Sequence, residues 1–366
     1  MPPIAKSLRT SICFYVVILV GFFFSATAHS SQQALSWEEN HLTLVQQHIV
    51  PSYHSLLTHS IQLKDAVALR CESLSTEPHN NPQPVQIKQA FKNLYMHWAA
   101  VQPINFGPIT YLKRQSRMQY WPDKHNVGSK QLRRLLRNNN TINLESLQKK
   151  SVAVQGLPAL EKILYSASSL TKDNCSLAHR ISENIASIAQ ENYDGWTLTP
   201  ALFMNDFLPE NYHYGTYSST NEITAILAKS ITHYLALIEK EKLKALVPKN
   251  NKKSNPKKLE AWRSGISAQL IYANTQTLEK IYLSVFSKPL THKNISLDKE
   301  IRATFTAIKQ SINTLHDSLY ETLQSSYTQT TILTWQKDIQ QLQRLIHQAF
   351  TEELGIAFTF NSLDGD

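Results

Sequence analysis

The sequence predicts an all-α fold, and three observations support this prediction. The 366 residues include only 9 glycines, and apolar residues recur at spacings of three and four over long stretches, as they do on one face of a helix. No segment alternates apolar and polar residues long enough to indicate a half-buried strand. A chain of this length also exceeds what one small core usually organises. We therefore predict two packed helical bundles.

The first 28 residues are predicted to form a cleavable signal peptide. Lys6 and Arg9 precede an apolar run over residues 12–24, and Ala26 and Ala28 supply small residues for cleavage. The alternative is an uncleaved anchor, but about 13 apolar residues fall short of the roughly 20 in a membrane-spanning helix. We expect a periplasmic protein without a transmembrane anchor after cleavage. Its formal net charge falls from +9 to +7 when Lys6 and Arg9 are removed.

The predicted helices follow one another along the whole mature chain. Residues 36–70 show the helical spacing most clearly, and Pro51 marks a start or a kink there. Further helices are predicted at residues 84–102, 129–137, 158–168, 176–195, 220–246, 256–287, 296–325 and 330–350.

The two bundles are assigned to residues 29–195 and 196–366. Trp98 and Trp262 each lie in a long amphipathic segment that follows a break rich in Pro and Asn. This single coincidence leaves an internal duplication open.

Two cysteines remain after cleavage, Cys71 and Cys175. An oxidising compartment favours a disulfide between them. In the chain-entropy model, closing a loop of about 100 residues stabilises the fold by roughly 4–5 kcal/mol. The alternative is a pair of buried thiols.

Much of the positive charge lies between residues 249 and 258, where five lysines mix with Asn, Ser and Pro. Such a run is typical of a solvated loop, with weak attraction to anionic phospholipid as the functional alternative. No aromatic interleaving or recognition motif accompanies it, so we expect no nucleic-acid partner. The sequence also lacks a Gly-rich phosphate loop, a Cys-x-x-Cys pair and a Gly-x-Ser-x-Gly motif.

Four stretches in order resemble the imelysin-like family of bacterial envelope proteins, whose signature is Gly-x-His-x-x-Glu. The signature loop is Gly156–Glu161, and Pro158 stands at the position of the family's His. The other stretches are Ile104–Pro108, Arg117–Asp123 and Trp262–Ser267, and the terminal residues 360–366 also fit. The resemblance implies two helical bundles with the signature loop near their junction.

The resemblance also implies a binding cleft at this junction. Its predicted residues are Arg117, Trp121, Asp123, Gly156, Pro158 and Glu161. A divalent metal or iron is the implied cofactor, with Glu161 as the ligand that the signature retains. His125 lies two residues after Asp123 and could restore a set of His and carboxylate ligands with Glu161. Neutral imidazole binds transition metals near neutral pH, so the replacement of His by Pro158 removes half of the family's ligand pair.

Local structure offers a second explanation for the same residues. Pro suits the first position of a helix, and Glu161 in the first turn would be stabilised by the helix dipole. Trp121 could simply pack, Asp123 could cap a turn and His125 could be solvated.

We expect a non-catalytic periplasmic binding protein linked to metal or iron acquisition, with envelope metal-uptake components as partners. One alternative is a metallopeptidase of the imelysin type. A catalytic zinc normally has three protein ligands and a water, whereas the signature loop supplies one carboxylate. The other alternative is a structural or interaction protein of the cell envelope.

Overall fold

The described part of the chain is mostly helical and contains no strand. The computed structural model describes residues 36–76, 85–137, 142–166, 170–198, 203–212, 215–244, 246, 255–314, 319–323 and 325–357. The predicted signal peptide, the lysines between 249 and 253, and residues 360–366 lie outside the described residues. Leu35–Asp366 forms one compact unit, and the division at residue 195 stays a prediction. None of the described helices is long and apolar enough to span a bilayer.

The N-terminal helical run confirms the prediction for residues 36–70. It consists of α1 (Trp37–Leu44), a π-helical turn η1 (Val45–Ile49) and α2 (Val50–Thr76). Ser36 and Glu39 form a capping box that starts α1, since each side chain accepts a hydrogen bond from the other residue's backbone N–H. Pro51 is the second residue of α2, directly after the π-helical turn.

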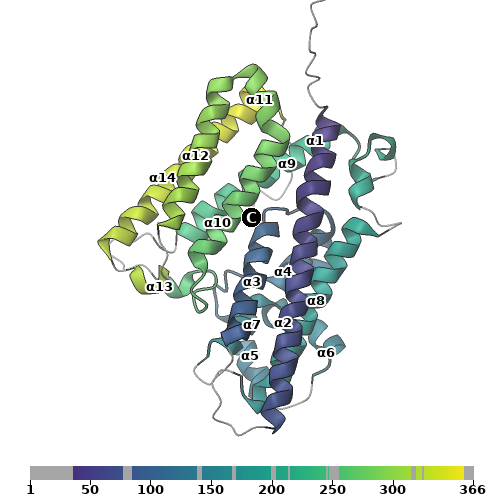
Figure 1. Cartoon of the computed structure of the whole chain (residues 1–366), viewed down its shortest axis with the longest axis vertical. Helices are drawn as coiled ribbons and strands as arrows, with labels where there is room; N and C mark the ends of the chain where they lie inside the picture. Colours follow the sequence, from purple (N-terminus) through teal and green to yellow (C-terminus); the bar gives the residue numbers. More distant parts are fainter. Residues whose placement is uncertain are drawn as a thin grey trace, which may run out of the picture. The chain divides into compact units, whose positions relative to one another are not determined.

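Helix α2 packs lengthwise against α8 (Lys172–Thr197) and α3 (Val85–Val101) (Figure 1). Cys71 of α2 and Cys175 of α8 form the predicted disulfide, with their Cα atoms 5.5 Å apart. The short elements between α3 and α8 are η2 (Gly107–Lys113), α4 (Arg114–Met118), α5 (Val127–Arg137), α6 (Leu144–Gln148), η3 (Val152–Val154) and α7 (Leu157–Leu164).

In the later half of the chain, α10 (Ser267–Ile281) packs against α3 on one hand and α12 (Ile295–Asn313) on the other. Helix α12 packs in turn against α14 (Ser326–Gln348) (Figure 1). The remaining elements are η4 (Phe203–Phe207), η5 (Pro209–Asn211), α9 (Thr220–Leu237), η6 (Ile238–Leu243), η7 (Pro256–Lys258), η8 (Tyr282–Phe286), α11 (Ser287–Lys293), α13 (Leu319–Thr322) and η9 (Ala349–Glu353).

The predicted helix at 256–287 is wrong over its first part. Residues 259–266 form turns, and α10 begins only at Ser267. Ala261 and Gly265 have φ values of 52° and 73°, which an α-helix does not allow. The side chains of Glu260 and Ser264 are buried in this segment, so tertiary contacts override its helical spacing.

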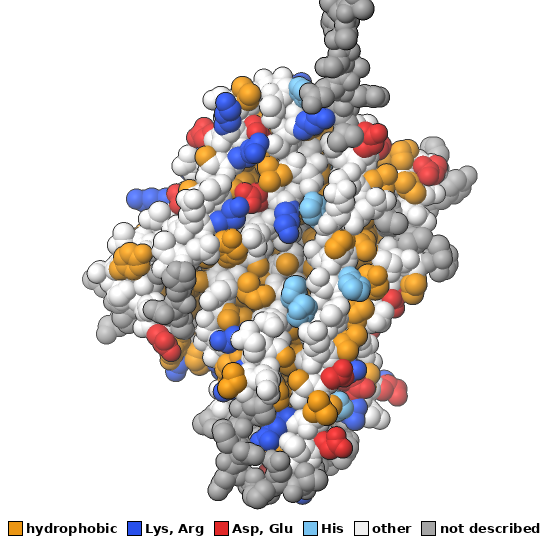
Figure 2. All heavy atoms as spheres, viewed as in Figure 1, with side chains coloured by type: hydrophobic (Ala, Val, Ile, Leu, Met, Phe, Trp, Pro, Cys, Tyr) orange, Lys and Arg blue, Asp and Glu red, His pale blue; other side chains and the backbone are white. Residues whose placement is uncertain are grey.

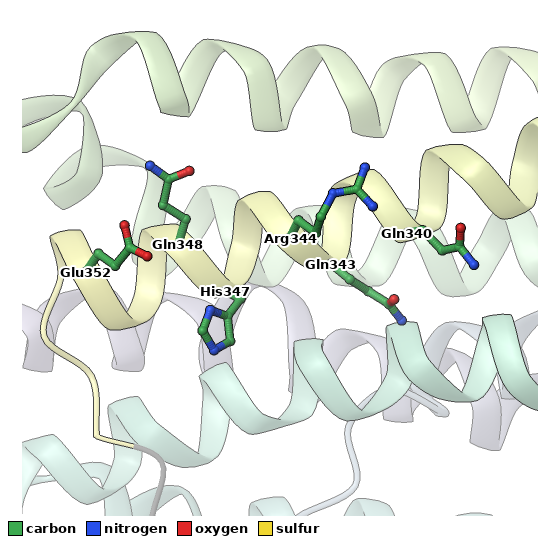
Figure 3. A pocket seen from close by; sticks show the side chains of 6 residues that line it. All are labelled: Gln340, Gln343, Arg344, His347, Gln348 and Glu352. Atoms are coloured by element: carbon green, nitrogen blue, oxygen red, sulfur yellow. The ribbon is translucent and has the colours of Figure 1, made fainter.

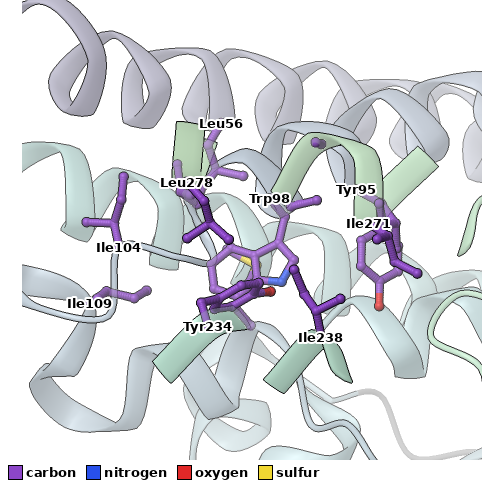
Figure 4. Close-up of a cluster of buried hydrophobic side chains, with 14 of the residues drawn as sticks. Leu56, Tyr95, Trp98, Ile104, Ile109, Tyr234, Ile238, Ile271 and Leu278 are labelled. Carbon is purple, nitrogen blue, oxygen red and sulfur yellow. The ribbon is translucent and has the colours of Figure 1, made fainter. Parts of the chain in front are cut away.

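The hydrophobic core continues from the early helices to the later ones. Trp98 of α3 is buried, with 1% of its surface exposed. Figure 4 shows it among side chains from α2, α9 and α10, including Leu56, Tyr234 and Leu278. The contact between the two halves is therefore a packed core.

Candidate functional site

Gly156 joins two of the four stretches that resemble the imelysin-like family. A Cβ atom at this position would collide with the backbone carbonyl oxygens of Arg117 and Met118. Gly156 has φ −126° and ψ −162°, an extended conformation that any residue adopts. The glycine is thus required for space, because only a residue without a side chain lets the two backbones approach this closely.

Helix α7 begins directly after Gly156, which is its N-cap residue. Pro158 is the second residue of the helix, one position later than predicted, where the missing N–H still costs no intrahelical hydrogen bond. Glu161 is the fifth residue, and the first turn contains no acidic residue. The explanation of Glu161 by the helix dipole is therefore wrong, since that effect falls off within the first turn.

Glu161 is buried, with 3% of its surface exposed. Its Oε1 accepts hydrogen bonds from the backbone N–H of Ser264 at 2.9 Å and from the Ser264 hydroxyl at 2.8 Å. Burial raises the pKa of Glu161, while the Ser264 hydrogen bonds and the charge of Arg263 oppose this rise. The signature loop is thus tied to the fourth stretch, Trp262–Ser267.

Asp123 caps the start of α5. Its Oδ1 accepts from the N–H of Val127 at 2.7 Å, and its Oδ2 accepts from the N–H of Gly128 at 3.1 Å. The ammonium of Lys162 lies 3.4 Å from the same Oδ2. Burial lowers the pKa of Lys162, whereas Asp123 and, to a smaller extent, Glu161 oppose that change. Asp123 therefore has the capping role considered above, and Lys162 is the cation that interacts with both carboxylates.

The Arg117 side chain binds residues other than these two carboxylates. Its Nε donates to Gln155 at 3.1 Å, and its Nη2 donates to Asn184 at 3.3 Å. The guanidinium that interacts with Glu161 belongs to Arg263 instead, and it stacks 4.1 Å from the ring centre of Trp262. Of the remaining predicted residues, Trp121 is half-buried and His125 is exposed.

A buried salt bridge that the sequence analysis missed lies close to the signature loop. Nζ of Lys242 is 2.5 Å from Oε2 of Glu260, and each side chain is only 3% exposed. Lys242 also donates to Asn274 at 2.6 Å and to Gln102 at 3.2 Å. Burial lowers the pKa of Lys242, and the negative charge of Glu260 opposes this effect.

Two glutamines extend this cluster to the second stretch. Gln102 donates to Oε1 of Glu260 at 3.0 Å, and Gln119 donates to the same oxygen and to the hydroxyl of Tyr95 at 3.1 Å. The indole of Trp98 donates to Gln119 at 2.6 Å. We call Gln102, Gln119, Lys242, Glu260 and Asn274 the buried polar junction. Only Gln119 falls in a stretch that the sequence analysis quoted.

The residues at the signature loop do not fit a transition metal. Pro158 offers no donor atom, and Oε1 of Glu161 already accepts two hydrogen bonds. Across the described residues, no group of three His, Cys, Asp or Glu side chains is placed to hold a metal ion. The proposed ligand pair of Glu161 and His125 stays a prediction, with one side chain buried and the other exposed.

The sequence profile described as imelysin (peptidase M75) matches residues 49–346. The chain belongs to the imelysin family. An imelysin-like protein from Psychrobacter arcticum 273-4 is similar in structure, with a TM-score of 0.72 and 18% identity over 88% of this chain and 97% of that one. A putative iron-regulated protein A precursor from Parabacteroides distasonis ATCC 8503 has a TM-score of 0.67 and 15% identity, covering 86% of this chain and 95% of that one. Among curated proteins, none matches this sequence.

These two likenesses show that the imelysin fold is retained. They agree with the all-α architecture, and the family assignment predicted from the four stretches is confirmed.

The surface of this imelysin-family protein has a hollow away from the signature loop. A shallow hollow of about 520 Å³ runs along α14 and η9, where the side chains shown in Figure 3 include Arg344, His347 and Glu352. These groups project from one helical run. Basic and acidic side chains are also interspersed on the face shown in Figure 2. Glu161 and Glu260, in contrast, are bound by polar side chains from several different segments of the chain.

Proposed function

We propose that this member of the imelysin family is a non-catalytic periplasmic binding protein that serves iron acquisition. The absence of catalysis is inferred from Glu161, because this side chain is buried and accepts two hydrogen bonds from Ser264. A metallopeptidase needs several ligands and an open coordination position for water. Pro158 and the buried Glu161 supply neither.

The link to iron has a separate basis. One structural neighbour carries the description of a putative iron-regulated protein A precursor, and the signal peptide predicted at residues 1–28 would deliver the chain to the periplasm. The proposed partners are envelope components of metal uptake. In this proposal Glu161 and the buried polar junction stabilise the fold without coordinating a metal.

The test measures hydrolysis and metal content together. Purified protein is assayed against a mixed peptide library, dialysed against zinc or ferrous iron, and analysed for bound metal by mass spectrometry. We expect neither hydrolysis nor metal at the signature loop in the wild-type protein. Tight metal binding should require P158H, because this substitution adds an imidazole three residues before Glu161.

The matched control is the double variant P158H/E161Q. It should lose any metal that P158H gains, since the amide is a poorer ligand than the carboxylate. Micromolar or tighter zinc or iron binding by the unmodified protein, abolished by E161A, would refute the non-metal part of the proposal. Peptide hydrolysis abolished by the same variant would support the metallopeptidase instead.

The role in iron acquisition and the location need their own measurements. A strain that lacks the gene should grow more slowly than its parent when an iron chelator is present, and iron should restore its growth. Cell fractionation should recover the protein with periplasmic markers, and deletion of residues 2–28 should retain it in the cytoplasm. Equal growth of the two strains under chelation would contradict the iron link.

A further inference from the structure

A second hollow is lined by Gln155, the residue directly before the signature loop, and by Arg117. It has a volume of about 430 Å³ and lies between the end of η2 and the segment that connects α6 to η3. Three of its lining residues are cationic, namely Lys113, Arg117 and Lys150, and none of the described lining residues is acidic. We call it the basic hollow.

The guanidinium in the basic hollow is held in a defined position. Gln155 and Asn184 accept hydrogen bonds from Nε and Nη2 of Arg117. Gln155 is itself fixed, because its amide donates to the carbonyl oxygens of Gln148 at 3.1 Å and Lys150 at 2.6 Å. Nη1 of Arg117 has only a distant contact with Glu191, at 3.8 Å. An ordered guanidinium suits bidentate recognition of an oxyanion.

The charge around the hollow is not balanced by neighbouring acids. Glu191 forms an ion pair with Arg114 at 3.0 Å and a longer one with Arg117 at 3.8 Å. Its single negative charge is therefore shared between two guanidiniums. Lys113 and Lys150 are exposed at the rim. Two exposed lysines and one fixed arginine therefore face the same space, which is the arrangement that attracts a multiply charged anion.

The backbone at the rim is strained as well. Leu112 and Lys113 have φ values of 50° and 55°, although neither is glycine. Left-handed conformations at such residues are unfavourable and concentrate at functional sites. Leu112 is also 74% exposed, so burial of its side chain does not account for the unusual backbone.

We infer that the basic hollow binds a phosphate group. A phosphate dianion matches the charge of two lysines and one arginine better than a single carboxylate does, and the guanidinium can contact two of its oxygens. The phosphate could be inorganic or could belong to the headgroup of an anionic phospholipid. This inference is independent of the role proposed for Glu161, because Arg117 binds Gln155, Asn184 and Glu191, whereas Glu161 is bound by Ser264.

Calorimetric titration of inorganic phosphate into the purified protein at low ionic strength tests the inference. We expect K150Q to weaken binding of the phosphate dianion about thirtyfold, the effect of one unit charge about 4 Å from two negative charges in water. The matched control is K149Q, at the neighbouring position. Lys149 forms an exposed ion pair with Glu145 at 2.5 Å, so its replacement should change affinity less than twofold.

Flotation with vesicles distinguishes the two sources of phosphate. Binding to inorganic phosphate that is sensitive to K150Q supports the free ion. Binding only to vesicles that contain phosphatidylglycerol, also sensitive to K150Q, supports the lipid headgroup. Absence of both kinds of binding, or equal effects of K149Q and K150Q, would overturn the inference.

Discussion

Substitutions of the buried pair Lys242 and Glu260 should have strongly coupled effects on the free energy of unfolding. Both side chains are 3% exposed and their charged atoms are 2.5 Å apart. Removing one partner of a buried ion pair leaves the other charge without compensation, which costs about 3–5 kcal/mol. We expect K242M to lower the free energy of unfolding by about 4 kcal/mol. E260Q should cost about 3 kcal/mol, because Asn274 and Gln102 still accept hydrogen bonds from Lys242.

The double variant K242M/E260Q leaves no unpaired charge in the junction. Its loss of stability should therefore be smaller than the sum of the two single losses by about 2–3 kcal/mol. Urea unfolding followed by far-UV circular dichroism measures all four proteins at pH 7. The exposed pair Lys149 and Glu145 provides the control, for which K149M and E145Q should be additive within about 0.5 kcal/mol. Additive losses at Lys242 and Glu260 would refute the argument that burial couples them.

Three further predictions concern the rest of the fold. Reduction of the Cys71–Cys175 disulfide, which spans a sequence separation of 104, should lower the free energy of unfolding by about 4–5 kcal/mol; identical urea curves with and without reductant would contradict this. Burial lowers the pKa of His41 from 6.5 to about 4, so its neutral form contributes about 3 kcal/mol of stability above pH 6.5 that is lost as the pH falls to 4. H41Q should remove that part of the pH dependence in unfolding curves, and an unchanged slope would count against it. G156A should cost about 3 kcal/mol, since its Cβ meets the carbonyl oxygens of Arg117 and Met118. G355A should cost only about 1 kcal/mol, because Gly355 has a left-handed φ but no atom near its Cβ position. Equal stabilities of the two glycine variants in thermal unfolding would show that the close approach at Gly156 is not required.

Several features of this protein follow from the sequence alone because they depend on neighbouring residues. Helical spacing predicts the run that contains α1 and α2, and Pro158 marks the start of α7 to within one position. The pairing of Cys71 with Cys175 follows because only two cysteines remain after the predicted cleavage. The family is also predicted from the four stretches, and the imelysin profile that matches residues 49–346 confirms it.

Only the tertiary structure decides what the carboxylates do. Glu161 looks like a helix-start residue in the sequence, yet Ser264 binds it from 103 residues away. Lys242 and Glu260 carry no local signal, because a lysine in one segment does not reveal which acid it will meet. The turns at residues 259–266 arise for the same reason: burying Glu260 and Ser264 against these distant partners outweighs the helical preference of the segment. Local spacing determines the helices, whereas long-range burial of charge determines the junction that they build.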